Sequence, residues 1–392
     1  MVQDAELRSN FETLYQARPR LYRAPGRVNL IGEHTDYNDG FVMPVAVDLY
    51  TWVAIAPRRD RKLVLHSQNY SDGVEVDLDR VSPGPRRHWS DYVRGVAAVL
   101  ERMGLRLPGA NLLIHGEVPI GSGLGSSAAL EVSSGYALLS LAGIPIDRTQ
   151  LSLACQRAEH EFAGTRCGIM DQFISCHGRS EHALLLDTRS LAFEWLPLPS
   201  QVSVIVCNTM VKHNLAADEY NTRRAECETG VRALAARLPE LRALRDAGSS
   251  DLEENAAALP QKIYRRCRHV ISENERVEAA ACALKEKNLA ALGRLMGESH
   301  RSLRDDYEVS CRELDVMVEL AAQLEGVYGA RMTGGGFGGC TVNLVRAEKS
   351  AQFQTRIAQE YEKHAGLKPE VYVCAAAEGA QERLSTGESI CA

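Results

Sequence analysis

Ionisable side chains gather in residues 27–37, at the end of a run with strand character. The segment holds an arginine, Glu33, His34 and Asp36 within eleven residues. Carboxylates accept hydrogen bonds from neighbouring hydroxyl groups, so the cluster suits a polyol such as a sugar. A metal site is the rival interpretation, but another group of His or Cys residues would normally complete it. A solvated strand end with chance charges is a third interpretation, weakened because residues 38–40 already supply the turn.

A glycine loop, PIGSGLGSSAA at 119–129, lies between a predicted strand at 111–118 and a predicted helix. Successive amides of such a loop at a helix N-terminus form a concave set of donors for phosphate. The segment has neither the G-K-[ST] of a Walker loop nor the spacing G-x-G-x-x-G. Ser126 and Ser127 follow directly, and a hydroxyl there can ligate Mg²⁺ bound to nucleotide phosphates. On this segment alone, a tight turn followed by a serine cap explains the pattern equally well.

A second glycine-rich segment, GGGFGG at 334–339, joins two predicted strands. Its five glycines in six positions exceed what a hairpin needs. Glycine at that density lets a backbone approach a ligand closely. A loop without a ligand is the alternative, and it is less favoured because strands on both sides would anchor the loop.

Asp171 stands between apolar neighbours in the segment CGIMDQF at 167–173. A carboxylate in such surroundings must be paired or functional. Considered by itself, Asp171 is best interpreted as a structural hydrogen-bond acceptor. A kinase, however, needs a group beside the acceptor hydroxyl, and an aspartate near an arginine can serve as the base or as the orienting group.

Extended runs position these candidates in the first half of the chain. Between two such runs, the Asp39-Gly40 step predicts a hairpin. Residues 150–175 are predicted to be helical, and HALLLDTRS at 182–190 returns to strand. The second half begins with a buried strand at 202–209 and continues with charged helical stretches from about 218 to 300. Ser310 and Glu313 predict a capping box at the start of the next helix.

The length of 392 residues suits two domains facing a cleft, which we place at 1–190 and 191–392. A net charge of -6 offers no basic surface for nucleic acid. No run approaches the roughly 18 to 20 apolar residues of a membrane span, and the opening MVQDAELRSN does not resemble a signal peptide. Eleven unclustered cysteines suit a reducing cytosol. We therefore expect a cytoplasmic monomer with neither nucleic acid nor membrane as a partner.

Together these segments resemble the galactokinases of the GHMP small-molecule kinase superfamily, over nearly the whole chain. APGRVNLIGEHTDYNDG at 24–40 is similar to the galactokinase signature. PIGSGLGSSAA is similar to the superfamily phosphate loop, and MTGGGFGGC at 332–340 to its third motif. Only the first motif is specific to galactokinases and their nearest relatives. The resemblance implies an α+β, two-domain GHMP kinase fold with a ribosomal S5-like N-terminal lobe and a ferredoxin-like C-terminal lobe.

The resemblance also implies an activity, the transfer of the γ-phosphoryl group of ATP to the anomeric hydroxyl of α-D-galactose. The products would be α-D-galactose 1-phosphate and ADP, in the first committed step of galactose catabolism by the Leloir pathway. Galactose and ATP are thus the expected partners, and Mg²⁺ is the expected cofactor. Carried over by motif, Arg27 and Asp171 are the catalytic pair. Asp171 either takes the anomeric proton or orients the hydroxyl.

The other site residues follow from the same motifs. The implied sugar contacts are Glu33, His34, Asp36, Gly168 and Tyr220. The implied phosphate-binding residues are Gly121, Ser122, Gly123, Leu124, Gly125, Ser126 and Ser127. Ser127 and Glu159 are the implied Mg²⁺ ligands, and Trp89 and Tyr92 would flank the adenine. The loop reads GLGSSAA where many galactokinases have GLSSSAS, so Gly125 removes one hydroxyl while the amides remain.

Two alternatives stay open. Another GHMP kinase, with N-acetylgalactosamine or arabinose as the acceptor, would carry the same motifs. A catalytically silent sugar sensor is the second alternative. Such sensors have lost residues of the phosphate loop, whereas Ser127 and Ala128 are present here, so the sensor ranks far behind.

Overall fold

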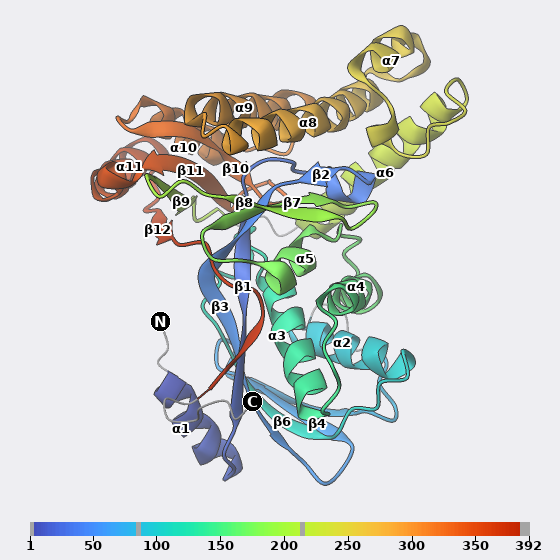
Figure 1. The fold of residues 1–392 in the computed structure, drawn as a ribbon, viewed down its shortest axis with the longest axis vertical. Coiled ribbons are helices and arrows are strands. Elements are labelled where there is room, and N and C mark those ends of the chain that lie inside the picture. Colours follow the sequence, from blue (N-terminus) through green and yellow to red (C-terminus); the bar gives the residue numbers. More distant parts are fainter. Residues whose placement is uncertain (1–3, 84–87, 212–215, 385–392) are drawn as a thin grey trace.

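The computed structural model describes residues 4–83, 88–211 and 216–384. Figure 1 shows two lobes, one built on a long twisted sheet and the other on a smaller sheet covered by helices. The long sheet has the strand order β13-β1-β3-β6-β4-β5. Its strands are β1 Arg20–Asn29, β3 Pro44–Pro57, β4 Lys62–Ser67, β5 Asp72–Asp77, β6 Ala110–Gly116 and β13 Gln381–Arg383.

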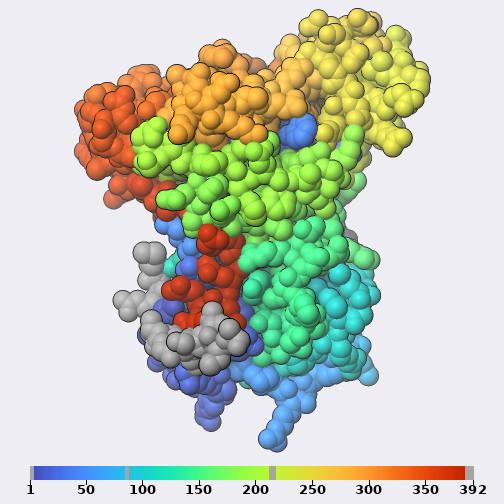
Figure 2. Space-filling view, in the orientation of Figure 1, coloured from blue at the N-terminus to red at the C-terminus, as the bar shows by residue number. Residues whose placement is uncertain are grey.

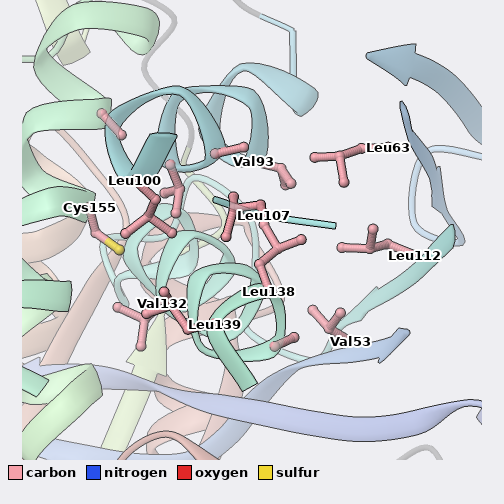
Figure 3. Close-up of a cluster of buried hydrophobic side chains, with 14 of the residues drawn as sticks. Val53, Leu63, Val93, Leu100, Leu107, Leu112, Val132, Leu138, Leu139 and Cys155 are labelled. Carbon is pink, nitrogen blue, oxygen red and sulfur yellow. The ribbon is translucent and has the colours of Figure 1, made fainter. Parts of the chain in front are cut away.

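Helices flank both faces of the long sheet (Figure 1). They are α1 Asp4–Tyr15 on one side and α2 Ser90–Arg102, α3 Ser126–Leu141, α4 Arg148–Ala158 and α5 Met170–His177 on the other. Figure 3 shows Val53, Leu63 and Leu112 of the sheet facing Leu138 and Val93 of the helices, and all five side chains are fully buried. Each such burial contributes about 1.5–3 kcal/mol, so this core holds the helices rigidly against the strands.

The second lobe is built on an antiparallel sheet with the strand order β10-β11-β9-β12. Its strands are β9 Val202–Asn208, β10 Val327–Thr333, β11 Cys340–Arg346 and β12 Glu370–Cys374. Its helices are α6 Ala216–Ala235, α7 Ser249–Glu254, α8 Gln261–Lys285, α9 Leu289–Ser302, α10 Arg312–Gln323 and α11 Ser350–Ala365. The buried strand, the charged helices and the glycine-linked strand pair expected from the sequence are all confirmed.

A third sheet, with the order β2-β7-β8, lies between the lobes (Figure 1). Its strands are β2 Phe41–Val42, β7 His182–Asp187 and β8 Phe193–Pro197. Short helical turns complete the fold at Asp36–Asn38, Glu159–Ala163, Leu244–Asp246, Ala256–Ala258, Leu303–Tyr307 and Ala347–Lys349. Among the described residues, no helix combines the length and the apolar character that a bilayer span requires.

The hairpin predicted at Asp39-Gly40 is confirmed in its pairing, because β1 and β3 pair antiparallel and Leu30 and Ile31 still bond Met43 beyond the strand ends. A tight turn at the Asp-Gly step is wrong, since residues 32–42 connect the two strands and β2 within them pairs with β7. The Gly40 carbonyl accepts hydrogen bonds from the Thr188 backbone and hydroxyl, at 3.0 and 2.8 Å. These tertiary contacts hold the turn, and the excursion carries the acidic cluster into the space between the lobes.

The predicted capping box is also wrong. Helix α10 begins at Arg312 after Cys311, and no side chain caps it. The Ser310 hydroxyl instead donates to the Asp315 carboxylate at 2.6 Å, because the charged acceptor competes with the backbone amide. The helical prediction for 150–175 is confirmed apart from a break at 164–169, between the turn at Glu159–Ala163 and α5.

The domain boundary near residue 190 stays a prediction. Residue 190 lies in the turn between β7 and β8, which pair with each other. The C-terminal strand β13 pairs with β1 of the long sheet, and Figure 2 shows these last described residues, in red, lying against the first lobe. The chain therefore returns to its first lobe after building the second.

Candidate active site

Two neighbouring cavities share the side chains of Arg27 and Asp171. The first, which we call the loop cavity, has a volume of about 360 Å³ and lies against the glycine loop at 121–127. The second, the acidic cavity, has a volume of about 140 Å³ and is lined by carboxylates that include Glu33 and Asp36. Since both cavities reach the same two side chains, molecules bound in them would meet there.

A bidentate ion pair fixes Arg27 against Asp171. The guanidinium donates from Nε to Oδ1 at 2.9 Å and from Nη2 to Oδ2 at 2.6 Å. Two parallel hydrogen bonds set the orientation of both side chains. The Arg27 side chain is 6% exposed and that of Asp171 is 24% exposed, so the carboxylate stays accessible from the cavities.

Arg27 is also tied to the glycine loop. Its Nη1 donates to the Gly123 carbonyl, and its backbone N–H donates to the Leu124 carbonyl at 2.8 Å. This approach requires Gly26, because a Cβ at that position would lie 2.8 Å from the Leu124 carbonyl oxygen. Gly26 of the signature motif therefore allows β1 to pack directly against the glycine loop.

Glu33 anchors the floor of the acidic cavity to the second lobe. Its Oε1 accepts from the Gly334 N–H at 2.7 Å and from the Thr333 hydroxyl at 3.2 Å. The guanidinium of Arg331 lies 3.6 Å from the same oxygen. Burial nevertheless raises the pKa of Glu33 above its ordinary value. The second glycine segment thus contacts the first motif directly, as its density of glycine suggested.

His34 has one ring nitrogen engaged and one free. Its Nδ1 lies 2.8 Å from the Tyr37 hydroxyl, while the buried Nε2 has no hydrogen-bond partner among the described residues. Burial and the neighbouring His269 and Arg223 lower the pKa of His34 well below its ordinary value, so the ring is neutral. The ring of Tyr220 lies 5.5 Å from that of His34, centroid to centroid. A neutral imidazole with a free nitrogen suits a hydroxyl partner.

Asp36 and Gly168 come into contact across the acidic cavity. A Cβ built on Gly168 would lie 2.0 Å from the Asp36 Cγ, so only glycine leaves the carboxylate in place. Burial, with the like charges of Asp171 and Glu33, raises the pKa of Asp36 to about 7. Near neutral pH this carboxyl group can therefore both donate and accept hydrogen bonds.

Replacing Gly168 with alanine is expected to raise the KM for the acceptor at least tenfold and to leave nucleotide affinity unchanged. The added methyl group displaces Asp36 within the acidic cavity but does not reach the loop cavity. Steady-state kinetics with each substrate varied would measure the two effects. Gly297→Ala is the matched control, because a Cβ there meets nothing within 4 Å. Equal KM values for Gly168→Ala and wild type would contradict the contact.

Asp36→Asn is expected to stabilise the protein at alkaline pH. The pKa of Asp36 is about 7 in the fold against an ordinary value of 3.8, so the native state binds this proton more tightly than the unfolded state. Ionisation therefore costs stability as pH rises from 4 to 7, a cost that asparagine lacks. We expect the variant to gain about 2–4 kcal/mol over wild type between pH 4 and pH 8. Urea unfolding at both pH values would test this, and a pH-independent difference would contradict it.

The loop cavity receives the N-terminus of α3. Gly121, Gly123 and Gly125 adopt left-handed φ values of 72°, 79° and 75°, and no side chain caps the helix. The free amides of this first turn can therefore bind an anion. Of the residues assigned to ATP, those that line the cavity are Gly121, Gly123, Gly125, Ser126, Ser127, Trp89 and Tyr92.

Ser122 and Leu124 do not line the loop cavity. The Ser122 hydroxyl donates to the Pro119 carbonyl at 2.7 Å, and the Leu124 side chain is buried in the core. Residues of the loop thus alternate between lining the cavity and facing the protein interior. The left-handed glycines on either side of Ser122 and Leu124 turn these two side chains inward. Only the backbone atoms of these two residues could therefore contact a bound nucleotide.

Three aromatic residues, Tyr70, Trp89 and Tyr92, line the loop cavity. Tyr70 and Trp89 lie with their ring planes 8° apart and their centroids at 6.2 Å. The Trp89 Nε1 donates to Asp72 at 2.9 Å, which fixes the orientation of the indole. The sequence indicated Trp89 and Tyr92 but not Tyr70, because an isolated Tyr in a polar turn carries no local signal.

Ser127 and Glu159 meet where the two cavities join. Glu159 accepts a hydrogen bond from Gln172 Nε2 at 2.8 Å, and the nearby Ser127 hydroxyl favours the ionised form of its carboxylate. Burial and the nearby Asp171 raise the pKa of Glu159 to about 7. Nowhere in the described ranges do three or more His, Cys, Asp or Glu side chains form a metal-binding group. One carboxylate and one hydroxyl suit Mg²⁺, which takes its other ligands from phosphates and water.

Sequence reasoning missed several lining residues. In the loop cavity these are Thr51, Ser67, Asn69, Tyr70, Ile114, Gly116, Val118, Ile120 and Leu130. In the acidic cavity they are Thr165, Cys167, Met170, Gly334 and Gly335. Gly334 and Gly335 carried a signal in the dense glycine segment. The others lie on strands, in loops and in helices α3 and α5, and the sequence does not show how these elements pack together.

Three family models match the chain. They are described as the galactokinase galactose-binding signature at residues 9–57, the GHMP kinases N terminal domain at 91–179 and the GHMP kinases C terminal at 280–363. The galactokinase of Chloroflexus aggregans is 50% identical over 370 residues, covering 94% of this chain and 95% of the relative. The chain belongs to the galactokinase family.

Solved structures agree with the galactokinase family and with the GHMP kinase fold. Lactococcus lactis galactokinase complexed with galactose is 34% identical, with a TM-score of 0.93 over 96% of this chain and 99% of that one. Methanococcus jannaschii mevalonate kinase, at 16% identity and a TM-score of 0.65 over 93% of this chain and 100% of that one, shares the fold alone. The expected α+β fold class is confirmed, and the protein is an ATP-dependent sugar kinase.

Proposed function

We propose that this galactokinase-family kinase joins galactose in the acidic cavity to ATP in the loop cavity at the Arg27–Asp171 pair. The observation that carries the proposal is the sharing of these two side chains by both cavities. A γ-phosphoryl group entering from one side would meet an anomeric hydroxyl entering from the other.

Galactose would be recognised by groups that differ in whether they donate or accept hydrogen bonds. Asp36, with its pKa about 7, can donate or accept, and His34 offers a free Nε2. Glu33 orients these contacts from the cavity floor, and the Tyr220 ring forms a wall beside His34. A site that hydrogen-bonds a hydroxyl discriminates strongly against analogues that lack it, because buried groups are then left unpaired.

ATP would bind with its phosphates at the α3 N-terminus and its adenine near Trp89 and Tyr92. The glycine-loop amides and the helix dipole both favour negative charge at this end of the cavity. Ser127 and Glu159 would hold Mg²⁺, which neutralises charge on the β- and γ-phosphates when bound. Tyr70 also lines this cavity.

The transfer would be a direct in-line displacement. Arg27, held by two hydrogen bonds, stabilises charge on the transferring group without reorganising. Asp171 contacts the anomeric hydroxyl and either accepts its proton or fixes its direction of attack. Bond formation to the anomeric oxygen accompanies cleavage of the bond to the ADP oxygen.

Ser127→Ala is expected to raise the Mg²⁺ concentration needed for half-maximal velocity several-fold. The hydroxyl is one of two proposed protein ligands, and a weakly held ion depends on each. Titrating Mg²⁺ at fixed ATP and galactose would measure this, with Ser126→Ala as the neighbouring control. An unchanged Mg²⁺ requirement would remove Ser127 from the site.

The activity is tested by ADP release with Mg-ATP and galactose, glucose, N-acetylgalactosamine, arabinose or mevalonate at equal concentration. We expect strong turnover with galactose and little with glucose. The two sugars differ only at carbon 4, where the hydroxyl is axial in galactose and equatorial in glucose. Turnover with another acceptor alone would reassign the substrate. No ADP release with any of the five acceptors, together with measurable galactose binding, would indicate a catalytically silent sensor.

A further inference from the structure

Arg331 lies behind the acidic cavity, near the C-terminal end of β10. Its side chain is fully buried and does not line the cavity itself. The Nη1 atom donates to the Asn29 carbonyl at 3.0 Å and lies 3.6 Å from Oε1 of Glu33. Strand β10 therefore brings an arginine of the second lobe against the end of β1 and against the first motif.

This arginine is incompletely paired. Its Nε and Nη2 atoms are buried and have no hydrogen-bond partner among the described residues. Burial lowers the pKa of Arg331, which means that the surroundings disfavour its charge. A buried charge of this kind costs stability, and an apolar side chain of similar volume often serves a fold as well. The arginine at this position is therefore better explained by the site in front of it than by the core around it.

The two carboxylate oxygens of Glu33 have different surroundings. Oε1 accepts hydrogen bonds from Gly334 and Thr333 and faces Arg331. Oε2 makes no hydrogen bond within the described part of the chain but is not fully enclosed, and Glu33 lines the acidic cavity. The protein thus engages one oxygen and leaves the other for a molecule in the cavity.

Positive charge nearby opposes the effect of burial on Glu33. Burial raises the pKa of Glu33, and Arg331 is the largest of the influences that lower it, ahead of Arg27. Arg27 is already engaged by Asp171 in a bidentate ion pair. An ionised carboxylate forms hydrogen bonds roughly twice as strong as those of a neutral group. Loss of the Arg331 charge would therefore weaken any hydrogen bond that Oε2 accepts.

The charge of Arg331 is itself supported from α8. Glu273 favours the protonated form of Arg331. Burial acts against ionisation of Glu273, but positive groups, Arg276 foremost, lower the pKa of this carboxyl to about 2. Arg276 Nε donates to Glu273 at 2.7 Å. Arg331 thus stands between two carboxylates, one that supports its charge and one whose charge it supports.

We propose that Arg331 is a positioning residue for the sugar acceptor, which fixes the Glu33 carboxylate as a charged acceptor with Oε2 open to a sugar hydroxyl. The inference rests on the proposed binding of galactose in the acidic cavity. Arg331 contacts neither substrate and acts through Glu33. Its removal should therefore weaken galactose binding, and it should have no effect once Glu33 has lost its own charge.

Calorimetric titration of the full-length protein with galactose tests this role. Arg331→Gln keeps a hydrogen-bond donor for the Asn29 carbonyl without the charge, and Arg331→Met removes both. We expect each variant to bind galactose at least tenfold more weakly than wild type. Affinity for a non-hydrolysable ATP analogue should stay within twofold, because Arg331 does not line the loop cavity. In steady-state kinetics the loss should appear in the KM for galactose, with kcat within threefold.

A double-mutant cycle separates this role from a structural one. Glu33→Gln removes the charge on which Arg331 acts, so adding Arg331→Gln to it should change galactose affinity less than twofold further. Two independent losses would multiply instead. Arg61→Met is the matched control, because Arg61 also contacts a carboxylate and a backbone carbonyl but lines neither cavity. Galactose affinity should remain within twofold in this variant.

Thermal unfolding of each variant establishes that it is folded, and Arg331→Met serves alone where Arg331→Gln is not. Three results would each overturn the proposal. They are unchanged galactose affinity in Arg331→Met, a loss in Arg331→Met that Arg331→Gln does not share, and losses that multiply in the double variant. Absence of galactose binding by wild type would overturn the proposed function, and this inference with it.

Discussion

Asp171→Asn is expected to lower kcat by about 10²- to 10⁴-fold while leaving the affinities for galactose and ATP within a few-fold. Asparagine keeps the shape of the side chain, but it cannot accept a proton at the anomeric hydroxyl. It also gives Arg27 one acceptor oxygen in place of the two that now bind at 2.6 and 2.9 Å. Single-turnover kinetics and equilibrium binding would separate the chemical step from substrate binding.

Two further variants show which property of the pair matters. Arg27→Lys keeps the positive charge but loses the planar fork, so a loss as large as that of Asp171→Asn would point to alignment of the pair. Asp147→Asn is the matched control, because Asp147 caps α4 far from the cavities and asparagine caps helices equally well. Near-normal turnover of Asp171→Asn would eliminate proton transfer and leave only orientation.

Arg266→Ala is expected to lower the free energy of unfolding by about 3–5 kcal/mol. The Arg266 side chain is only 1% exposed and donates to Glu226 at 2.8 Å, to the Asp306 carbonyl at 2.5 Å and to Glu308 at 2.6 Å. Removing it leaves the largely buried Glu226 without its buried partner and the Asp306 carbonyl without its donor. Denaturant unfolding, compared at a constant m value, would measure the loss.

Lys262→Ala supplies the control for this prediction. Lys262 pairs with the same carboxylate, Glu226, but its side chain is 55% exposed. An ion pair open to solvent contributes about 0–1 kcal/mol, so this variant should unfold almost like wild type. An equal loss of unfolding free energy in the two variants would show that the contribution of Arg266 to stability does not depend on its burial.

The residues that could be predicted from the sequence are those grouped in short motifs. Arg27, Glu33, His34 and Asp36 fall within eleven residues, and a compact arrangement follows from local spacing alone. The glycine loop at 119–129 was placed correctly between a strand and a helix, because glycine and periodicity are local signals. These motifs supply the charged side chains at one end of the acidic cavity and the glycine loop of the other cavity, and the remaining lining comes from other segments.

Contacts between distant segments could not be predicted. The fit of Gly168 against Asp36 depends on a break in the helical run at 164–169, for which only Gly164 gives a hint. The Asp39-Gly40 and Ser310–Glu313 signals were local and were overridden by Thr188 and Asp315. Tertiary partners with better geometry or charge win over local preferences of about 1 kcal/mol.

The pairing of β13 with β1 has a consequence for biosynthesis. Arg20 and Glu382, which bond across this pair, are separated by 362 positions in the chain. During translation the strands of the first lobe emerge early, while the edge of β1 has no neighbour until the second lobe has been made. An open strand edge is where unwanted pairing begins. The long sheet of the first lobe is therefore completed only after the second lobe has been synthesised. Until then the open edge of β1 leaves the nascent chain exposed to unwanted strand pairing.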